Sequence, residues 1–267
     1  MKKQLNVLVT GAASGIGGSI AEKFLAEGHK VFGVDIKEIP ERDNMISRIL
    51  DVTDLASVEA FSSELSSDGV TLDLIISAAG IHAMASLVED DIGAMKRLMD
   101  VNLIGCMQLV RALHPHLAKN GRIIIITSEV AGFEPMPFNG LYNVSKTALE
   151  CYAQALRQEL NLIGQRVITV RPGAVKTPLA DGSVKATEAL AERTELYQKG
   201  AKRFSSIASK FMGKPIEPKK LSSLVYKAST AKRPRLVYKK HQNIGLVLLN
   251  LLPLRLQCAI IKLLLNG

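Results

Sequence analysis

The chain alternates between short apolar runs and longer segments of helical period. Near-continuous runs of Val, Ile and Leu are typical of strands that are buried on both faces of a parallel sheet. We expect such strands at 6–10, 30–35, 72–77, 122–128 and 166–170, with weaker candidates at 46–50 and 235–239. Segments of helical period lie at 16–27, 54–66, 91–118 and 142–163. This alternation predicts an α/β fold, a doubly wound parallel sheet with helices on both faces.

The pattern runs without a linker to about residue 175, which predicts a single domain over residues 1–267. Residues 178–220 are less regular, and we expect them to cover a substrate site. Residues 241–267 form an apolar C-terminal segment, but Pro253, Arg255 and Lys262 interrupt it. It is therefore a poor membrane span. Core packing, a dimer contact and an interfacial helix all remain open for it.

Composition and charge limit the kinds of partner that this chain is expected to have. The chain is 47% hydrophobic, which suffices for a large core, and its formal net charge is +9. Residues 199–240 contain ten lysines and three arginines against one acid, Glu217, so the excess charge is local. Such a segment attracts anionic lipid, an acidic carrier protein or nucleic acid, or is simply a solvated face. It lacks a nucleic-acid motif and interleaved aromatics, so we expect no nucleic-acid partner.

The cysteines and histidines indicate a reduced compartment and no metal. The three cysteines are scattered without ligand spacing, and His114 and His116 only flank Pro115. The apolar run at 5–10 is too short for a signal peptide. We expect a cytoplasmic protein that can also contact a membrane peripherally.

A glycine-rich turn, TGAASGIG at 10–17, separates the first expected strand from the first expected helix. Glycines let the backbone approach a pyrophosphate, which a helix N-terminus attracts. The alternative is a turn with a purely structural role. The strand before it and the helix after it are, however, the context that nucleotide binding requires.

Asp35 ends the second expected strand. A carboxylate there accepts hydrogen bonds from ribose hydroxyls and repels a 2′-phosphate. No Arg or Lys lies within the glycine turn, although Lys37 is near Asp35 in the sequence. We therefore expect NAD(H) rather than NADP(H); the alternative is a solvated loop aspartate.

Tyr142 stands four residues before Lys146 in LYNVSK, residues 141–146. On a helix these positions share a face. An ammonium beside a phenol favours the phenolate and lowers the tyrosine pKa, which suits acid–base catalysis near neutral pH. One such pair is weak evidence alone, because it also arises on ordinary surface helices.

Taken together, the motifs resemble the short-chain dehydrogenase/reductase family, in its compact single-domain branch with a Rossmann-like sheet. In chain order they are TGAASGIG (10–17), Asp51, NLIG (102–105), Ser128, YNVSK (142–146) and RPGAVKT (171–177). The stretch PFNGLYNVSKTALE is most similar to members that act on steroids, retinoids and other lipophilic alcohols.

In that family a nicotinamide cofactor exchanges a hydride with a secondary alcohol or a ketone. The resemblance implies that Tyr142 is the general acid or base, that Lys146 lowers its pKa and binds ribose, and that Ser128 hydrogen-bonds the reacting oxygen. Asn102 would lie in the fourth helix and hold a water leading to Lys146. The expected cofactor-binding residues are Gly11, Ser14, Gly15, Ile16, Gly17, Asp35, Asp51, Val52, Ala79, Gly80, Tyr142, Lys146, Pro172, Gly173, Val175 and Thr177. The family also implies a homodimer or homotetramer.

Two positions depart from the family pattern. Ala78 stands where an asparagine is common, so a hydrogen bond is lost or comes from Ser77. The family serine falls one residue after Ser128, at Glu129. Either the turn shifts register and brings Ser128 to the site, or Glu129 lies there with a raised pKa. We favour Ser128, whose hydroxyl donates without desolvating a charge.

Apolar residues near the motifs predict a lipophilic substrate with a hydroxyl or ketone, such as a sterol, a retinoid or a fatty-acyl chain. They are Met84, Met136, Phe138 and Leu179. A rival hypothesis is a nucleotide-binding sensor or scaffold at a membrane surface, without turnover. The presence of both Tyr142 and Lys146 argues against it, because a pure binder needs no acid–base pair.

Overall fold

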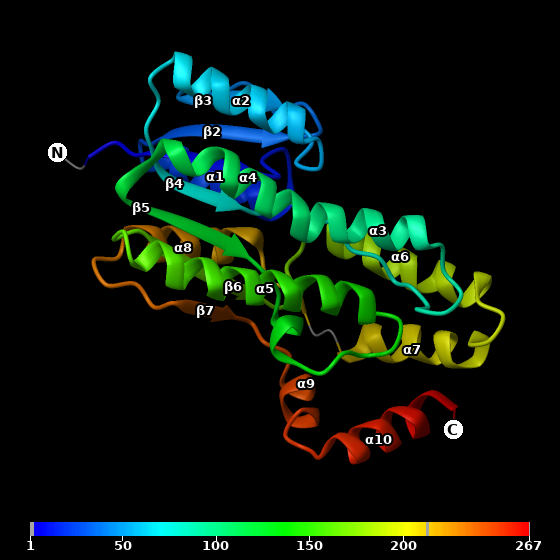
Figure 1. Ribbon diagram of the computed structural model, residues 1–267. Coiled ribbons are helices and arrows are strands. Elements are labelled where there is room, and N and C mark those ends of the chain that lie inside the picture. Colours follow the sequence, from blue (N-terminus) through cyan, green and yellow to red (C-terminus); the bar gives the residue numbers. More distant parts are fainter. Residues whose placement is uncertain (1–2, 212–213, 267) are drawn as a thin grey trace.

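The structure, a computed structural model, describes residues 3–211 and 214–266. Its centre is a seven-stranded parallel sheet in the order β3-β2-β1-β4-β5-β6-β7 (Figure 1). The strands are β1 (Asn6–Thr10), β2 (Lys30–Asp35), β3 (Met45–Ile49), β4 (Leu72–Ser77), β5 (Leu117–Ile126), β6 (Arg166–Pro172) and β7 (Val237–Lys240). The predicted doubly wound fold is confirmed, including both weaker strand candidates.

Helices cover both faces of the sheet, and each face has its own apolar core. On one face lie α2 (Leu55–Ser67), α4 (Gly105–Leu113) and α5 (Gly140–Asn161); on the other lie α1 (Gly15–Ala26) and α8 (Pro218–Thr230). Successive strand side chains point to opposite faces. Leu8 therefore joins the first core, while Val7 and Val9 join the second.

The helix expected at 91–118 is shorter and divided. It consists of α3 (Ile92–Met99), a π-helical stretch (Asp100–Ile104) and α4, and it ends in a 3₁₀ turn at His114–His116. Pro115 lies in that turn, where a proline cannot continue an α-helix. Residues 117–118 instead begin β5, which starts earlier than the expected strand at 122.

The segment 178–220 is more regular than expected. It contains α6 (Pro178–Arg193) and α7 (Gln198–Phe211), and Pro218 opens α8, which the sequence did not reveal. Prolines at the first turn of α6 and α8 start helices rather than end them. Residues 212–213 of this segment, and residue 267 of the C-terminal segment, lie outside the described residues.

The C-terminal segment folds into α9 (Ile244–Leu249) and α10 (Leu254–Asn266), with Pro253 between them. Figure 1 shows α10 below α7, and Leu265 joins an apolar cluster with Leu190 and Phe204 of α6 and α7. Within residues 3–211 and 214–266, no helix is long and apolar enough to cross a membrane.

The glycine turn should tolerate no extra methyl group at Gly17. A Cβ there would stand 2.2 Å from the carbonyl oxygen of Gly11. We expect Gly17→Ala to lower the free energy of unfolding by roughly 1–3 kcal/mol. Gly182, inside α6, has nothing within 4 Å of its Cβ position, so Gly182→Ala should stabilise by roughly 0.5–1 kcal/mol. Urea unfolding measures the free energy of unfolding of both variants. Equal changes in stability at the two positions would contradict the prediction.

Candidate active site

The expected site residues gather at the carboxyl ends of the strands. The glycine turn follows β1, Asp35 ends β2, Asp51 and Val52 follow β3, Ala79 and Gly80 follow β4, Ser128 follows β5, and Pro172–Thr177 lie at and after the end of β6. The strand order reverses between β1 and β4. Open α/β sheets bind ligands in the crevice at such a point.

The glycine turn packs closely against the end of β4. Gly11 and Gly15 have φ values of 68° and 58°, in the left-handed region that glycine favours. The hydroxyl of Thr10 accepts the N–H groups of Ala78 and Ala79, at 3.0 and 2.9 Å. Thr10, rather than Ser77, therefore holds the turn in which Ala78 replaces the common asparagine.

The acidic residues at the nucleotide edge are engaged with the backbone. Asp35 accepts the N–H groups of Ala13 and Lys37, each at 3.0 Å, and so ties β2 to the glycine turn. Asp51 is exposed and accepts the N–H and hydroxyl of Thr53, whereas Val52 is buried. Asp35 is thus fixed in place at the end of β2, with its carboxylate directed toward the turn.

A cavity of about 400 Å³ lies beside the glycine turn and is lined partly by Ser14, Gly15, Arg42 and Lys176. Arg42 is paired with Glu22, and Lys176 with Glu217, at 3.0 and 3.6 Å. These cations are remote from the turn in sequence, so the search for a basic residue within the turn missed them. Glu22 and Glu217 line the same cavity and offset the charges of these two cations, whereas Lys219 is a further cation in its lining.

Tyr142 and Lys146 lie one turn apart on α5, as expected. Lys146 is only 5% exposed, and its Nζ lies 5.8 Å from the centroid of the Tyr142 ring. A Cβ on Gly80 would stand 3.3 Å from that Nζ and 3.1 Å from Oδ1 of Asn102. The absence of a side chain at Gly80 therefore leaves space in front of both polar groups.

Burial governs the protonation of this pair. It raises the pKa of Tyr142 to about 12, although the nearby Ser128 hydroxyl acts in the opposite direction. It lowers the pKa of Lys146 to about 8. The expected lowering of the tyrosine pKa is thus not present in the protein alone, because desolvation penalises the phenolate.

Ser128 and Glu129 point in different directions. The Ser128 hydroxyl lies close enough to Tyr142 to lower the pKa of the phenol, and it accepts the N–H of Val130 at 3.4 Å. The Glu129 carboxylate instead accepts the N–H of Asn243, at 2.6 Å, in the C-terminal segment. Burial raises the pKa of Glu129, as expected, but the residue does not face the tyrosine. Glu129, at the position where the family pattern has its serine, is therefore directed toward the C-terminal segment, and Ser128 is the residue that acts on Tyr142.

Asn102 lies in the π-helical stretch rather than in a regular α-helix. It is buried, exchanges hydrogen bonds with the backbone of Ile81 at 2.8 and 2.9 Å, and donates to Oγ of Ser145 at 3.0 Å. These bonds join the turn after β4 to α5. Single-turn π-helical insertions are frequent at functional sites.

The turn after β6 is held by its neighbours. The N–H of Gly173 donates to the carbonyl of Lys240 at 2.8 Å, and Val175 pairs with Ile216. Thr177 caps α6 by accepting the N–H of Ala180 at 3.3 Å. Its Cβ lies 3.6 Å from the Cβ position of Gly15, so this turn meets the glycine turn.

His82 is a site residue that sequence reasoning missed. Its ring packs edge-on against Tyr142, with centroids 4.5 Å apart, and burial lowers its pKa. Its nitrogens bond to Oδ1 of Asn139 at 2.9 Å and to Oγ of Ser183 at 2.8 Å. The position of His82, two residues after Gly80, was the available signal. Through Ser183, it connects α6 to the tyrosine.

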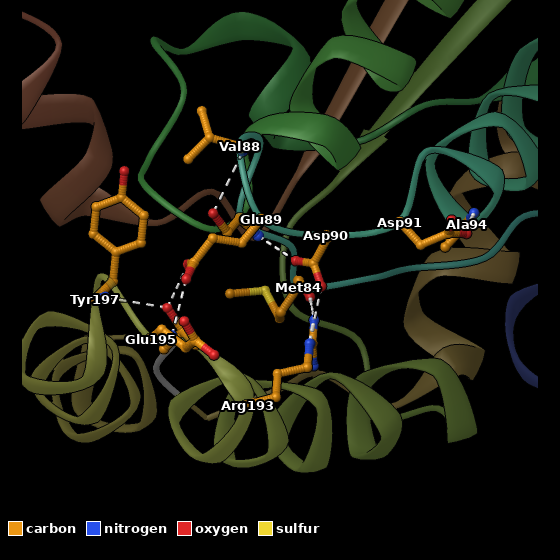
Figure 2. Close-up of polar contacts among 11 residues, drawn as sticks. Met84, Val88, Glu89, Asp90, Asp91, Ala94, Arg193, Glu195 and Tyr197 are labelled. Atoms are coloured by element: carbon orange, nitrogen blue, oxygen red, sulfur yellow. Dashed lines mark hydrogen bonds and ion pairs between the residues drawn. The ribbon is translucent and has the colours of Figure 1, made fainter.

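A polar clasp, formed by Met84, Glu89, Asp90, Arg193 and residues 194–196, secures the connection between α6 and α7 (Figure 2). The Glu89 carboxylate accepts the hydroxyl of Thr194 and the N–H groups of residues 195 and 196. Arg193 bonds to Asp90 at 2.9 Å and to the Met84 carbonyl at 2.8 Å. The loop after β4 thereby holds both helices in place.

The expected apolar rim is largely brought together. Met84, Met136 and Phe138 belong to the apolar cluster with α6 and α7, while Leu179 is more exposed. Among the residues that the structure describes, no group of three or more His, Cys, Asp or Glu side chains is placed to hold a metal ion.

The comparisons with known proteins define the class. The family described as short chain dehydrogenase matches residues 5–188. The chain therefore belongs to the short-chain dehydrogenase family, whose members are oxidoreductases that act on CH–OH groups.

Two relatives and two solved structures indicate the range within that family. The chain is 28% identical over 233 residues to a 3-ketodihydrosphingosine reductase of Bacteroides thetaiotaomicron, covering 85% of this chain and 84% of the relative. It is 30% identical over 205 residues to an NADPH-dependent 1-acyldihydroxyacetone phosphate reductase of Schizosaccharomyces pombe, covering 74% and 69%.

The two structures share the fold. A short chain dehydrogenase of Burkholderia cenocepacia in complex with NADP matches with a TM-score of 0.74 at 22% identity, covering 99% of both chains. A 3-ketoacyl-(acyl-carrier-protein) reductase of Brucella melitensis, complexed with NADH, matches with a TM-score of 0.71 at 23% identity, covering 88% of this chain and 96% of that one.

Replacing the buried Lys146 should stabilise the protein. Because its pKa is lowered to about 8, holding it charged at pH 7 opposes folding. We expect Lys146→Met to raise the free energy of unfolding at pH 7 by roughly 1–3 kcal/mol. The gain should shrink as the pH rises above about 8, where the folded wild type loses this proton before the unfolded chain does.

Urea unfolding at several pH values measures this gain. Lys96→Met, at an exposed position of α3, is the control and should change stability little. A Lys146→Met variant that is less stable than wild type at pH 7 would contradict the assigned burial effect.

Proposed function

We propose that this protein reduces a ketone on a lipophilic molecule, or oxidises the matching secondary alcohol. The proposal rests on one observation: Tyr142, Ser128 and Lys146 lie close together beside the glycine turn. Three features of this site fit a nicotinamide dinucleotide. The backbone is open at Gly80, Gly11 and Gly15 form a left-handed turn, and a helix N-terminus lies behind that turn. When bound, this cofactor supplies or accepts the hydride.

The side chains divide the remaining work. Tyr142 gives its proton to the carbonyl oxygen in reduction, and takes it from the hydroxyl in oxidation. Ser128, whose hydroxyl acts on the pKa of Tyr142, holds the same oxygen. Lys146 in its charged form favours the phenolate and binds the ribose hydroxyls. Asn102 fixes the turn after β4 relative to α5, and a water between Asn102 and Lys146 completes the proton path.

The proposed cofactor is NAD(H). Asp35 is anchored at the end of β2, where its negative charge opposes a 2′-phosphate. The cations at the neighbouring cavity favour the opposite choice, and the yeast relative is named as NADPH-dependent. Arg42 and Lys176 are already paired with acids, so we give more weight to Asp35. Asp51 and Val52 would then flank the adenine, and Pro172, Gly173, Val175 and Thr177 the nicotinamide.

The proposed substrate is lipophilic because the apolar cluster formed by Met84, Phe138, Leu190 and Phe204 lies under the covering helices α6 and α7. The two named relatives support it, since their names describe reductases of 3-ketodihydrosphingosine and of 1-acyldihydroxyacetone phosphate. We propose that residues 178–220 cover this substrate.

Tyr142→Phe should abolish turnover and keep cofactor binding. Wild type should consume NADH, and NADPH less efficiently, with a panel of lipophilic ketones. We expect kcat to fall by roughly 10²–10⁴-fold in Tyr142→Phe, because the proton donor is lost. NADH fluorescence titration should give a Kd close to wild type.

Tyr152→Phe, on the same helix, is the matched control and should retain activity. A wild type that binds NADH but turns over none of the ketones would favour the sensor or scaffold hypothesis. Turnover that survives in Tyr142→Phe would remove Tyr142 from its role.

We also propose a peripheral contact with anionic membrane. Large apolar side chains on the C-terminal segment are exposed, among them Ile244 (74%), Leu251 (76%) and Leu263 (72%). The basic residues of 199–240 precede them in the chain, and α10 packs on α7, which carries part of that charge. Apolar and cationic groups together bind anionic lipid surfaces. A second copy of the chain is the competing occupant, since the family resemblance implies oligomers.

The double variant Leu251→Asp/Leu254→Asp should release the protein from phosphatidylserine-containing vesicles. We expect sedimented protein to fall by roughly tenfold or more, because apolar burial is lost and negative charge is added. Leu162→Asp, at an exposed leucine after α5, is the control. Unchanged vesicle binding, or a loss of oligomer mass instead, would reject the membrane contact.

A further inference from the structure

Glu129 is the residue for which neither the family pattern nor the proposed chemistry has a use. It directly follows Ser128, is only 9% exposed, and is directed away from Tyr142. A buried carboxylate is unfavourable unless it is well hydrogen-bonded. Its carboxylate meets the start of the C-terminal segment, where Oε2 accepts the N–H of Asn243 at 2.6 Å.

Three turns meet at this carboxylate, those after β5, β6 and β7. Oε1 of Glu129 lies 3.2 Å from the Cβ position of Gly173. The carbonyl oxygen of His241 would stand 1.8 Å from that same Cβ, so only glycine fits at position 173. The N–H of Gly173 also donates to the carbonyl of Lys240. The C-terminal segment is thus seated directly on the turn expected to face the nicotinamide.

Asn243 caps α9, since its side chain accepts the N–H of Leu246 at 3.2 Å. Further along, the C-terminal segment contacts the site again. Oδ1 of Asn250 accepts the N–H of Glu134, at 2.6 Å, in the loop that leads from Ser128 to Tyr142. At its far end, Leu265 is 8% exposed in the cluster with Phe204.

Few groups among the described residues stabilise the ionised form of the Glu129 carboxylate. Besides the N–H of Asn243, the nearby imidazole of His241 favours its ionised form, whereas burial disfavours it. His241 in turn is fixed by a hydrogen bond between its Nε2 and the carbonyl of Lys214, at 2.9 Å. The contact to Asn243 is therefore the principal hydrogen bond that offsets the burial of this carboxylate.

We propose that Glu129 is a positioning residue whose carboxylate fastens residues 241–266 to the turn that carries Ser128, so that this serine stays beside Tyr142 while the segment is docked. The inference rests on the proposed function, in which Ser128 holds the reacting oxygen. It also accounts for Glu129 at the position where the family pattern has its serine: the carboxylate there serves the fastening, and Ser128 takes the place beside Tyr142.

Amide hydrogen exchange of the full-length protein tests the fastening without requiring activity. We expect Glu129→Ala to speed exchange in residues 130–134 and 243–250 by roughly tenfold or more, because a charge-assisted hydrogen bond is lost. Exchange in β1 and β4 should not change. Glu134→Ala, an exposed glutamate in the same loop, is the matched control and should behave as wild type.

A pair of variants at Asn243 isolates the bond from the other side. Its φ of −72° is compatible with proline, so Asn243→Pro removes the donated N–H without forcing this torsion. Asn243→Ala keeps the N–H and removes the side chain, including the cap. We expect Asn243→Pro to reproduce the exchange of Glu129→Ala, Asn243→Ala to stay closer to wild type, and the double variant Glu129→Ala/Asn243→Pro to add little.

Kinetics then separate positioning of the serine from anchoring alone. We expect kcat to fall by roughly tenfold in Glu129→Ala and Asn243→Pro, on small and long ketones alike, with an unchanged KM for NADH. Exchange in residues 130–134 and 243–250 that does not respond to Glu129→Ala would overturn the proposal. Faster exchange with unchanged kcat would also overturn it, because the segment would then be anchored without positioning Ser128. A wild type inactive on every ketone would refute the proposed function, while the exchange data would still decide the fastening.

Discussion

The site depends on keeping an ammonium group buried beside a phenol. Lys146 and Tyr142 are both desolvated on α5, and burial moves both pKa values toward the neutral forms. A buried charge of this kind opposes folding. The surrounding structure supplies the rigidity that holds the pair: β6, on which α5 packs, and the Asn102 bridge between Ile81 and Ser145. The space in front of the pair is kept open by Gly80, which has no side chain to fill it.

The sheet and the placing of Tyr142 beside Lys146 were predictable from the sequence because both depend on local patterns. Buried parallel strands read as runs of Val, Ile and Leu, and Tyr142 and Lys146 share a helix face by spacing alone. The helices α6 and α7 were not recognised. Their segment, 178–220, was expected only to be less regular, although Pro178 stands where proline is favourable, in the first turn of a helix.

What the sequence could not show were contacts between distant segments. His82 meets Tyr142 only because the loop after β4 folds over α5, and Ser183 reaches it from α6. The clasp of Glu89 and Arg193 likewise joins residues about one hundred positions apart. The direction of the tyrosine pKa failed for a related reason. Spacing showed the neighbouring lysine, but burial, a property of the whole fold, has the larger effect.

The C-terminal segment combines two surfaces that composition alone cannot separate. Its inner side makes specific polar contacts with the active-site turns through Asn243 and Asn250, and it ends with Leu265 in the apolar cluster. Its outer side leaves leucines exposed. A purely internal helix would bury these leucines, and a purely interfacial one would have no need of a buried carboxylate at its start. An element with both properties is suited to bring a lipid surface, and the helices α6 and α7 that we propose cover the substrate, into contact with the turn that carries Ser128.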